Sequence, residues 1–306
     1  MPITKTPYVK SCLNYTGGKY KLLNQLFSLF PENIHNFVDL FCGGANVLIN
    51  MEATGTMTGI DNQKEVIRLY ETLKMYSERE ILDLIYSIIS EFQLSETRKF
   101  GYSYYGCDSS SGVGAYNKLP FLKLRDTYNS RTENNCYYDT IFYLLTVYGF
   151  NNQIRFNKNM KFNIPVGKRD FNEKIEQNLL QFMRRIKEKN VNFICSDFRN
   201  IDYQLTDGDF LYADPPYLIS TASYNEQGGW TEQDERDLLN FLDDLDRRNV
   251  KFALSNVTIH KGKENTILID WSKKYHCHYL DYDYNNSNYQ SNARMNQTQE
   301  VLITNY

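Results

Sequence analysis

The sequence predicts an α/β protein whose open, mostly parallel sheet is interrupted by a helical insertion. Short apolar runs typical of buried strands alternate with helical patterns up to residue 76 and again after residue 190. The intervening residues 77–190 show helical periods and one hairpin pattern. With 306 residues, 42% of them hydrophobic, the chain can bury a sizeable core, and its formal net charge of -3 gives no global attraction to polyanions. Any polyanion site must therefore be local.

The first part of the sheet is predicted from a strand, a glycine turn and a second strand. An apolar run at residues 37–41 ends in Cys-Gly-Gly, and a helix is expected over residues 45–52. A second strand, residues 57–60, ends in Asp61, and residues 64–76 have helical spacing. Together these elements predict a parallel β-α-β unit with a right-handed crossover.

The middle of the chain interrupts this alternation. Helical spacing runs through residues 119–128 and 137–147, and a segment rich in Gly, Ser and Tyr occupies residues 101–114. Strand patterns then return at residues 191–195, 210–213, 250–255, 278–282 and 301–304. We therefore expect one domain of residues 1–76 and 191–306, and an inserted domain of residues 77–190.

Two features of the last third complete the predicted fold. Residues 231–248 have helical spacing, with Thr231 as N-cap and Asp234 three residues later, which is the arrangement of a capping box. The Asn-rich residues 285–296 predict a mobile loop.

The cysteines and the apolar runs indicate a cytosolic protein, and the spacing of its histidines and cysteines does not predict a metal site. Six cysteines occur without a CxxC pair, as expected for free thiols in a reducing compartment. No apolar run could span a bilayer, and the first ten residues lack the apolar core of a signal peptide. His276 and His278 flank Cys277, but no second cluster completes a zinc site, so we expect no metal.

The turn after the first strand has the layout of a nucleoside site. Gly43 and Gly44 let a ligand approach the backbone, and Asp61 at the end of the next strand can accept hydrogen bonds from both ribose hydroxyls. The fingerprint GxGxxG is absent, which favours a nucleoside without a pyrophosphate. The alternative is that the glycines only form a tight turn and that Asp61 is a helix N-cap.

The sequence Asp-Pro-Pro-Tyr at residues 214–217 indicates chemistry on an aromatic amine. Two prolines cannot continue a central ladder, so the chain must leave the sheet at its carboxyl edge, where such sheets bind ligands. There Asp214 and the carbonyl of Pro215 could accept both hydrogens of an exocyclic amine and free its lone pair, while Tyr217 could stack on the base. The alternative is an ordinary proline turn with a solvated aspartate.

These residues resemble the Dam-type (D12 class) DNA N6-adenine methyltransferases, which use S-adenosylmethionine. The resemblance runs nearly end to end, through NYTGGK at residues 14–19, residues 37–44, Asp61, residues 150–169, DPPY and EVLITN at residues 300–305. It implies a Rossmann-like, S-adenosylmethionine-dependent methyltransferase sheet in which the insertion is a mainly helical DNA-recognition subdomain with a β-hairpin.

The resemblance also implies which residues form the site. The expected cofactor-binding residues are Tyr15, Lys19, Asp39, Phe41, Gly43, Asp61, Asp197, Phe198 and Asp214, and the expected catalytic motif is Asp214, Pro215, Pro216 and Tyr217. Two roles stay open. Lys19 could contact the cofactor, a DNA phosphate or only solvent, and residues 197–198 could equally be a structural connection.

Other nucleotide-directed functions do not fit the residues. A cytosine-C5 methyltransferase needs a nucleophilic cysteine, usually after proline, and no cysteine here follows a proline. A P-loop is absent, because GGK is followed by Tyr20 and lacks the spaced glycine. RNA adenine or cytosine N4 remain alternative targets, and so does a non-catalytic DNA-binding protein that keeps the fold.

A predicted β-hairpin within residues 150–169 is the expected DNA reader. Residues 155–190 hold ten Lys/Arg and four Asp/Glu, whereas residues 231–248 hold three and seven, so positive charge gathers near the hairpin. The expected DNA-binding residues are Asn152, Gln153, Arg155, Pro165 and Arg169.

The resemblance implies that these residues read GATC in double-stranded DNA. Arg155 and Arg169 match guanine-reading positions, and Pro165 would lie beside the target. Gln153 departs from the pattern, because GATC enzymes carry Met or Leu there, and it could change the choice of the central bases. The expected setting is the cytoplasm of a bacterial or phage-infected cell, with a cognate restriction endonuclease encoded nearby as one partner and no obligate protein partner indicated.

Overall fold

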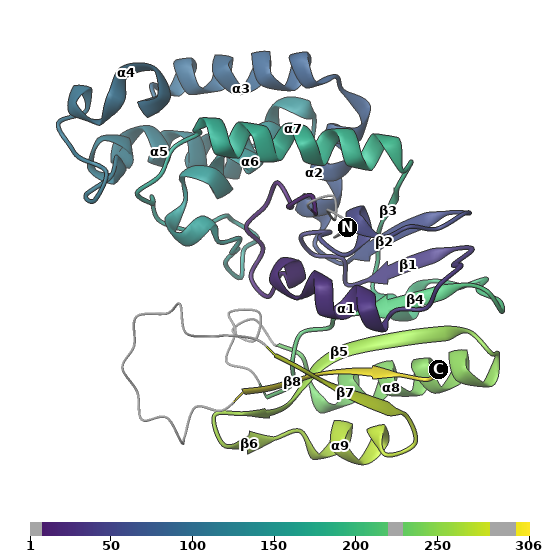
Figure 1. Cartoon of the computed structure of the whole chain (residues 1–306). Coiled ribbons are helices and arrows are strands. Elements are labelled where there is room, and N and C mark those ends of the chain that lie inside the picture. Colours follow the sequence, from purple (N-terminus) through teal and green to yellow (C-terminus); the bar gives the residue numbers. More distant parts are fainter. Residues whose placement is uncertain (1–7, 220–228, 282–297) are drawn as a thin grey trace, which may run out of the picture. The chain divides into compact units, whose positions relative to one another are not determined.

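A computed structural model describes residues 8–219, 229–281 and 298–306 (Figure 1). They form two compact units, one of residues up to Gly18 with Gln63–Phe193 and the other of Lys19–Asn62 with Ile194–Tyr306. This division differs from the expected boundaries, since helix α2 (Lys64–Met75) belongs to the helical unit. The reason is packing: the ring of Tyr70 on α2 lies 5.1 Å from that of Phe182 on α7 (Glu173–Glu188).

An open, mixed sheet contains eight strands of the described residues, in the order β3-β2-β1-β4-β5-β8-β7 with β6 beside β5. The strands are β1 (Phe37–Leu40), β2 (Met57–Asp61), β3 (Asn192–Cys195), β4 (Phe210–Ala213), β5 (Lys251–His260), β6 (Lys263–Glu264), β7 (His276–Leu280) and β8 (Thr298–Thr304). Neighbours from β2 through β1 and β4 to β5 are parallel, and β8 is antiparallel to β5 and β7. The predicted open α/β sheet is confirmed.

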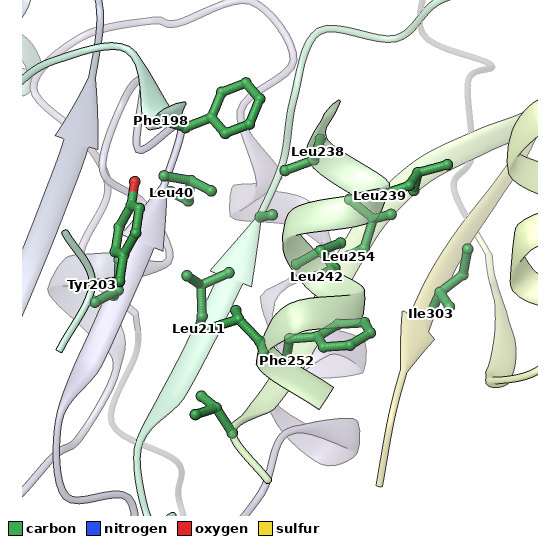
Figure 2. Packing of buried hydrophobic residues seen from close by; sticks show 14 of the residues in the cluster. Leu40, Phe198, Tyr203, Leu211, Leu238, Leu239, Leu242, Phe252, Leu254 and Ile303 are labelled. Atoms are coloured by element: carbon green, nitrogen blue, oxygen red, sulfur yellow. The ribbon is translucent and has the colours of Figure 1, made fainter. Parts of the chain in front are cut away.

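The core of the second unit lies between the sheet and helix α8 (Glu232–Arg247). Leu40, Leu211 and Phe252 from three adjacent strands meet Leu238 and Leu242 from the helix, as Figure 2 shows. All five side chains are fully buried, and burial of such side chains is the main favourable term in folding. This packing fixes the strand ends at which the candidate site lies.

The predicted start of α8 is confirmed in detail. The Thr231 hydroxyl accepts a hydrogen bond from the backbone of Asp234, and the Asp234 carboxylate accepts one from the backbone of Thr231. These two bonds form the expected capping box, which satisfies amide groups that the first helical turn leaves without partners.

The first unit is mainly helical. Besides α2 and α7 it contains α3 (Glu78–Phe92), α4 (Thr97–Tyr104), α5 (Gly114–Asn129) and α6 (Cys136–Tyr148). Helix α6 is the central one, because every residue from Asp139 to Tyr148 is buried. None of the helices in the described residues combines the length and the apolar character that a membrane-spanning helix needs.

Several predicted elements are wrong or shifted. The helix expected at residues 45–52 is a turn followed by the short 3-10 helix η2 (Leu48–Asn50), because Ala45 is left-handed with φ 55°. The strand expected at residues 278–282 begins earlier, at His276, and β5 extends to His260. Helices α1 (Leu23–Leu29) and α9 (Thr266–Ser272) had no prediction. The loop expected at residues 285–296 lies outside the described residues.

The buried carboxylate of Asp209, just before β4, gives a pH-dependent contribution to stability. Burial alone would raise its pKa, but hydrogen bonds from the amides of Thr206 and Asn36, 2.9 Å each, lower it below the usual value. A lowered pKa stabilises the fold above pH ~4 and loses this effect as the pH falls through the folded-state pKa. Asp209→Asn should reduce the free energy of unfolding by about 1–3 kcal/mol at pH 7. Urea unfolding at pH 7 and pH 3 checks this, and an equal loss at both pH values would contradict it.

Candidate active site

The predicted site residues of the sheet gather at the carboxyl ends of three adjacent parallel strands. Leu40 at the end of β1 is paired with Ile60 of β2 on one side and with Ala213 of β4 on the other. The residues that follow, including Asp61 and Asp214, therefore share one edge. The strand order reverses between β1 and β4, and open α/β sheets bind their ligands at such a switch point.

Two buried carboxylates hold the turn after β1. Asp61 Oδ2 accepts a hydrogen bond from the Gly43 amide at 2.9 Å, and Asp39 Oδ2 accepts one from the Leu48 amide at 3.1 Å. Phe41 and Gly43 are left-handed, with φ 68° and 45°, a conformation that glycine adopts readily and phenylalanine rarely. Burial, followed by the charge of Asp214, raises the pKa of Asp39 well above its usual value. The turn is thus fixed by the two strands that flank it in sequence.

The alternative role of Asp61 as a helix N-cap is wrong. Helix α2 has Gln63 as its N-cap, and the Asp61 side chain bonds to the turn instead. A carboxylate has two oxygens and can accept several hydrogen bonds, of which the bond from Gly43 is one.

Asp214 is held by two partners and is not a solvated turn residue. Its side chain is 18% exposed, and its Oδ2 lies 2.8 Å from the ammonium of Lys19. Its Oδ1 accepts a hydrogen bond from the Tyr217 hydroxyl at 3.1 Å. The structure thus contradicts the alternative of a proline turn with a solvated aspartate. Lys19 is 6% exposed and pairs with the aspartate of the DPPY motif, so the role of contacting only solvent is wrong.

Glu300 is a site residue that the sequence interpretation missed. Its Oε1 lies 3.5 Å from Lys19 Nζ and accepts a hydrogen bond from Tyr217 at 3.3 Å, and its side chain is 5% exposed. The signal in the sequence is a carboxylate immediately before the apolar run at residues 301–303. Because β8 is antiparallel to β5, its first residues lie at the edge where β5 ends.

The charges of this cluster determine the protonation of its members. Burial disfavours the charged form of Lys19, but the carboxylates of Asp214 and Glu300 outweigh it and raise its pKa. Burial raises the pKa of Asp214, and the charge of Lys19 opposes this effect. Burial also raises the pKa of Tyr217 well above its usual value, so its hydroxyl stays protonated.

An aromatic cluster lies beside the turn. The ring of Phe41 is 5.5 Å from those of Phe198 and Trp230, which are 6.0 Å from each other. The indole of Trp230 donates a hydrogen bond of 2.6 Å to the buried carboxylate of Glu235. Of the predicted pair 197–198, the structure brings only the phenylalanine into this cluster, because Asp197 accepts the Arg199 amide and pairs with its guanidinium. Trp230 had no signal in the sequence beyond its place before an N-cap.

The remaining predicted cofactor residue, Tyr15, belongs to the other unit. Its carbonyl accepts a hydrogen bond of 3.1 Å from the amide of Gly18, and Gly17 between them has φ 80°. The segment NYTGGK therefore forms a tight turn, and the glycine at its centre is required by the left-handed backbone.

The predicted hairpin of the helical unit is present, although its pairing is short. Phe156 and Phe162 form an isolated antiparallel bridge, and the amide of Asn157 donates to the carbonyl of Lys161. The Nε of Arg155 donates to the Asn163 side chain at 2.9 Å, so this guanidinium is oriented by the opposite side of the hairpin.

The other predicted DNA-binding residues differ in their environment. Arg169 and Pro165 are exposed, and Gln153 is half-buried. The side-chain amide of Asn152 donates to the carbonyls of Thr146 and Val147 at 3.0 Å each, so it caps the end of α6. The buried carboxylate of Asp170, next to Arg169, accepts two hydrogen bonds from Thr97 and fixes the base of this segment.

Neither metal ligands nor disulfides appear in the part of the chain that the structure describes. No group of three or more His, Cys, Asp and Glu side chains there could hold a metal ion. The six cysteines, all within the described residues, are free thiols.

Comparison with known proteins identifies related sequences. The family model "D12 class N6 adenine-specific DNA methyltransferase" matches residues 15–296. The chain is 40% identical over 306 residues to the Type II methyltransferase M.FokI of Planomicrobium okeanokoites, covering 98% of this chain and 43% of that protein. It is 30% identical over 267 residues to the Type II methyltransferase M.MjaIII of Methanocaldococcus jannaschii, covering 81% and 84%. To the DNA adenine methylase of Escherichia coli K12 it is 23% identical over 251 residues, covering 81% and 80%. The chain thus spans less than half the length of M.FokI.

Proposed function

Because the chain belongs to the family of D12 class N6 adenine-specific DNA methyltransferases, we propose that it transfers a methyl group from S-adenosylmethionine to N6 of an adenine flipped out of duplex DNA. The observation that carries this proposal is the position of Asp214. It lies at the switch point of the sheet, next to the turn after β1, and its carboxylate is fixed by Lys19 and Tyr217.

The residues at this edge fit the cofactor. Asp61 would accept hydrogen bonds from the ribose, and the rings of Phe41 and Phe198 offer an apolar surface for the adenine. The acidic groups around Lys19 suit a positively charged sulfonium. When bound, the cofactor supplies an electrophilic methyl group on that sulfonium. Lys19, Asp39 and Gly43 would complete or support the site, and Asp197 would act only by stabilising the turn at residues 197–200. Tyr15 is proposed as a cofactor-binding residue on the family resemblance alone.

Asp214 and Pro215 would activate the target amine. The N6 lone pair of adenine is delocalised into the ring, so the amine is a poor nucleophile. The Asp214 carboxylate and the Pro215 carbonyl would each accept one amine hydrogen, which favours a pyramidal nitrogen with an available lone pair. Pro216 gives the corner its rigidity, and the Tyr217 ring would stack on the flipped base. Positioning and polarisation then account for catalysis without a metal or a covalent enzyme intermediate.

Label transfer tests this proposal directly. The parent protein is incubated with methyl-tritiated S-adenosylmethionine and with duplex DNA, single-stranded DNA or RNA. We expect label in duplex DNA. Label only in RNA would favour an RNA methyltransferase, and binding of DNA without transfer would favour a non-catalytic relative.

We further propose that the hairpin reads the recognition sequence and that this sequence is GATC, as the Dam-type resemblance implies. The guanidinium of Arg155 is oriented by its hydrogen bond to Asn163, and that of Arg169 is exposed. Each could donate two hydrogen bonds to O6 and N7 of a guanine. Pro165 is exposed, as a residue beside the target must be. Asn152 supports the segment through its bonds to α6, and Gln153 would contact the central bases.

Arg169→Ala should cost about 1–3 kcal/mol of discrimination at a single base pair, because one bidentate contact is lost. Methylation rates on GATC duplexes, each substituted at one position, measure this. Lys168→Ala is the matched control, because Lys168 is the exposed neighbour of Arg169 and its ammonium lies 3.5 Å from the Ser110 carbonyl. If Lys168 contacts a DNA phosphate, its loss should lower the methylation rate of all duplexes by the same factor. If Arg169→Ala also weakens all duplexes by one factor, the hairpin is not the reader. If the parent does not prefer GATC, that recognition sequence is wrong.

We also propose that the chain works in the cytoplasm of a bacterial or phage-infected cell, as part of a restriction–modification system. Its support is the similarity to the modification methylase StsI of Streptococcus sanguinis, to which the chain is 40% identical over 311 residues, covering 98% of this chain and 43% of that protein. A cognate restriction endonuclease encoded nearby would then be its partner. Protection of host DNA from that endonuclease on expression of the chain would test this setting.

A further inference from the structure

The ammonium of Lys19 contacts two carboxylates that come from distant parts of the chain. Lys19 lies on the 3-10 helix η1 (Lys19–Leu22), Asp214 follows β4, and Glu300 lies on β8. The Nζ atom is 2.8 Å from Asp214 and 3.5 Å from Glu300, and all three groups belong to one unit. Asp214 alone would suffice to pair the ammonium, so the second carboxylate needs a separate explanation.

Glu300 occupies a position at which the fold alone would favour an apolar residue. It is paired with Val257 on one side and Leu280 on the other, and the next three residues of β8 are completely buried. A carboxylate in such a place loses hydration, and this loss is offset only by good partners. The contacts with Lys19 and Tyr217 provide such partners, and both of these residues also hold Asp214.

The contacts around Lys19 bring more negative than positive formal charge together among the described residues. The carboxylates of Asp214 and Glu300 both face the single ammonium of Lys19, at 2.8 Å and 3.5 Å. In a buried site, an excess of one sign attracts a ligand of the opposite sign. A ligand bound beside Asp214 would therefore be favoured if it carried a positive charge.

We propose that Glu300 is a positioning residue that makes this site distinguish the positively charged sulfonium of the cofactor from the neutral thioether of the product. It engages the Lys19 ammonium and the Tyr217 hydroxyl, so that less of the Asp214 charge is neutralised by Lys19. The Asp214 carboxylate then keeps more of its negative charge, and this charge attracts the sulfonium. The neutral product gains nothing from this charge and leaves more readily. This inference rests on the proposed function, since it requires the cofactor to bind beside Asp214.

Calorimetric titration with S-adenosylmethionine and with S-adenosylhomocysteine tests the inference, because only the first carries the charge. Glu300→Gln keeps the shape of the side chain and removes its charge. We expect it to weaken binding of S-adenosylmethionine by about tenfold or more and binding of S-adenosylhomocysteine by less than about twofold. A merely structural role would weaken both ligands alike.

Two further variants complete the experiment. Asp209→Asn removes another buried carboxylate of the same unit, at the opposite end of β4, and should leave the ratio of the two affinities unchanged. Glu300→Asp keeps the charge and should keep the ratio within about threefold of the parent, even if both affinities fall. An equal loss for both ligands in Glu300→Gln, or a ratio in Glu300→Asp as low as in Glu300→Gln, would overturn the inference. If the parent binds neither ligand, the proposed function fails instead.

Discussion

Asp214→Ala is expected to reduce methyl transfer to duplex DNA by at least about 100- to 1000-fold, the effect of removing one group that stabilises a transition state. The variant loses the carboxylate that would accept an amine hydrogen of the target. It also leaves the buried ammonium of Lys19 with only one of its two carboxylate contacts among the described residues, and it removes an acceptor of the Tyr217 hydroxyl. Single-turnover rates with saturating cofactor and DNA measure the chemical step.

The controls for this experiment separate chemistry from folding. Circular dichroism should show an intact fold for Asp214→Ala, and Asp209→Asn, which alters the other end of β4, should transfer the methyl group at nearly the parent rate. Asp214→Asn retains one acceptor oxygen and should fall between the parent and the alanine variant. A folded Asp214→Ala protein with a rate near that of the parent would remove Asp214 from the mechanism.

Asp61→Ala is expected to weaken cofactor binding by tens to hundreds of fold, which corresponds to about 2–4 kcal/mol. Two losses add in this variant. The ribose hydroxyls lose their acceptor, and the Gly43 amide loses the carboxylate that fixes the left-handed turn after β1. Calorimetric titration with S-adenosylhomocysteine measures the affinity without turnover.

A second variant separates the loss of the ribose acceptor from the loss of the bond to the Gly43 amide. Asp61→Asn keeps one carbonyl oxygen that can accept from Gly43 but has no second acceptor for the ribose. It should therefore bind the cofactor with intermediate affinity. Unchanged affinity in Asp61→Ala would show that this carboxylate is not part of the cofactor site.

The parts of the fold that the sequence predicts are those determined by local composition. The strands at residues 37–40, 57–61 and 210–213 are predicted within one residue, because each is a short, mostly buried segment bounded by a turn or by a polar residue. The α8 capping box was predicted because its two side chains are only three residues apart. The helix at residues 45–52 was wrong, because the Asp39 carboxylate takes the Leu48 amide and Ala45 is left-handed. Both effects depend on tertiary structure.

The same distinction applies to the site. DPPY and the glycine turn are short motifs whose position at a strand end follows from the sequence alone. The contact of Lys19 with Asp214 joins residues 195 positions apart, and no local pattern predicts it. Glu300 completes the cluster only because β8 enters the sheet antiparallel to β5. Asn152 was predicted to bind DNA, and no pattern in the sequence indicates that its amide bonds to the end of α6.

The most direct test of the central claim is the identity of the methylated nucleoside. Duplex DNA is incubated with the parent protein and S-adenosylmethionine, digested to nucleosides and analysed by mass spectrometry, with the Asp214→Ala protein as the blank. The proposed mechanism predicts N6-methyladenosine in its deoxy form, present with the parent and absent with the variant. N4-methylcytosine as the product, or no methylated nucleoside from a folded parent protein that binds the cofactor and DNA, would contradict it.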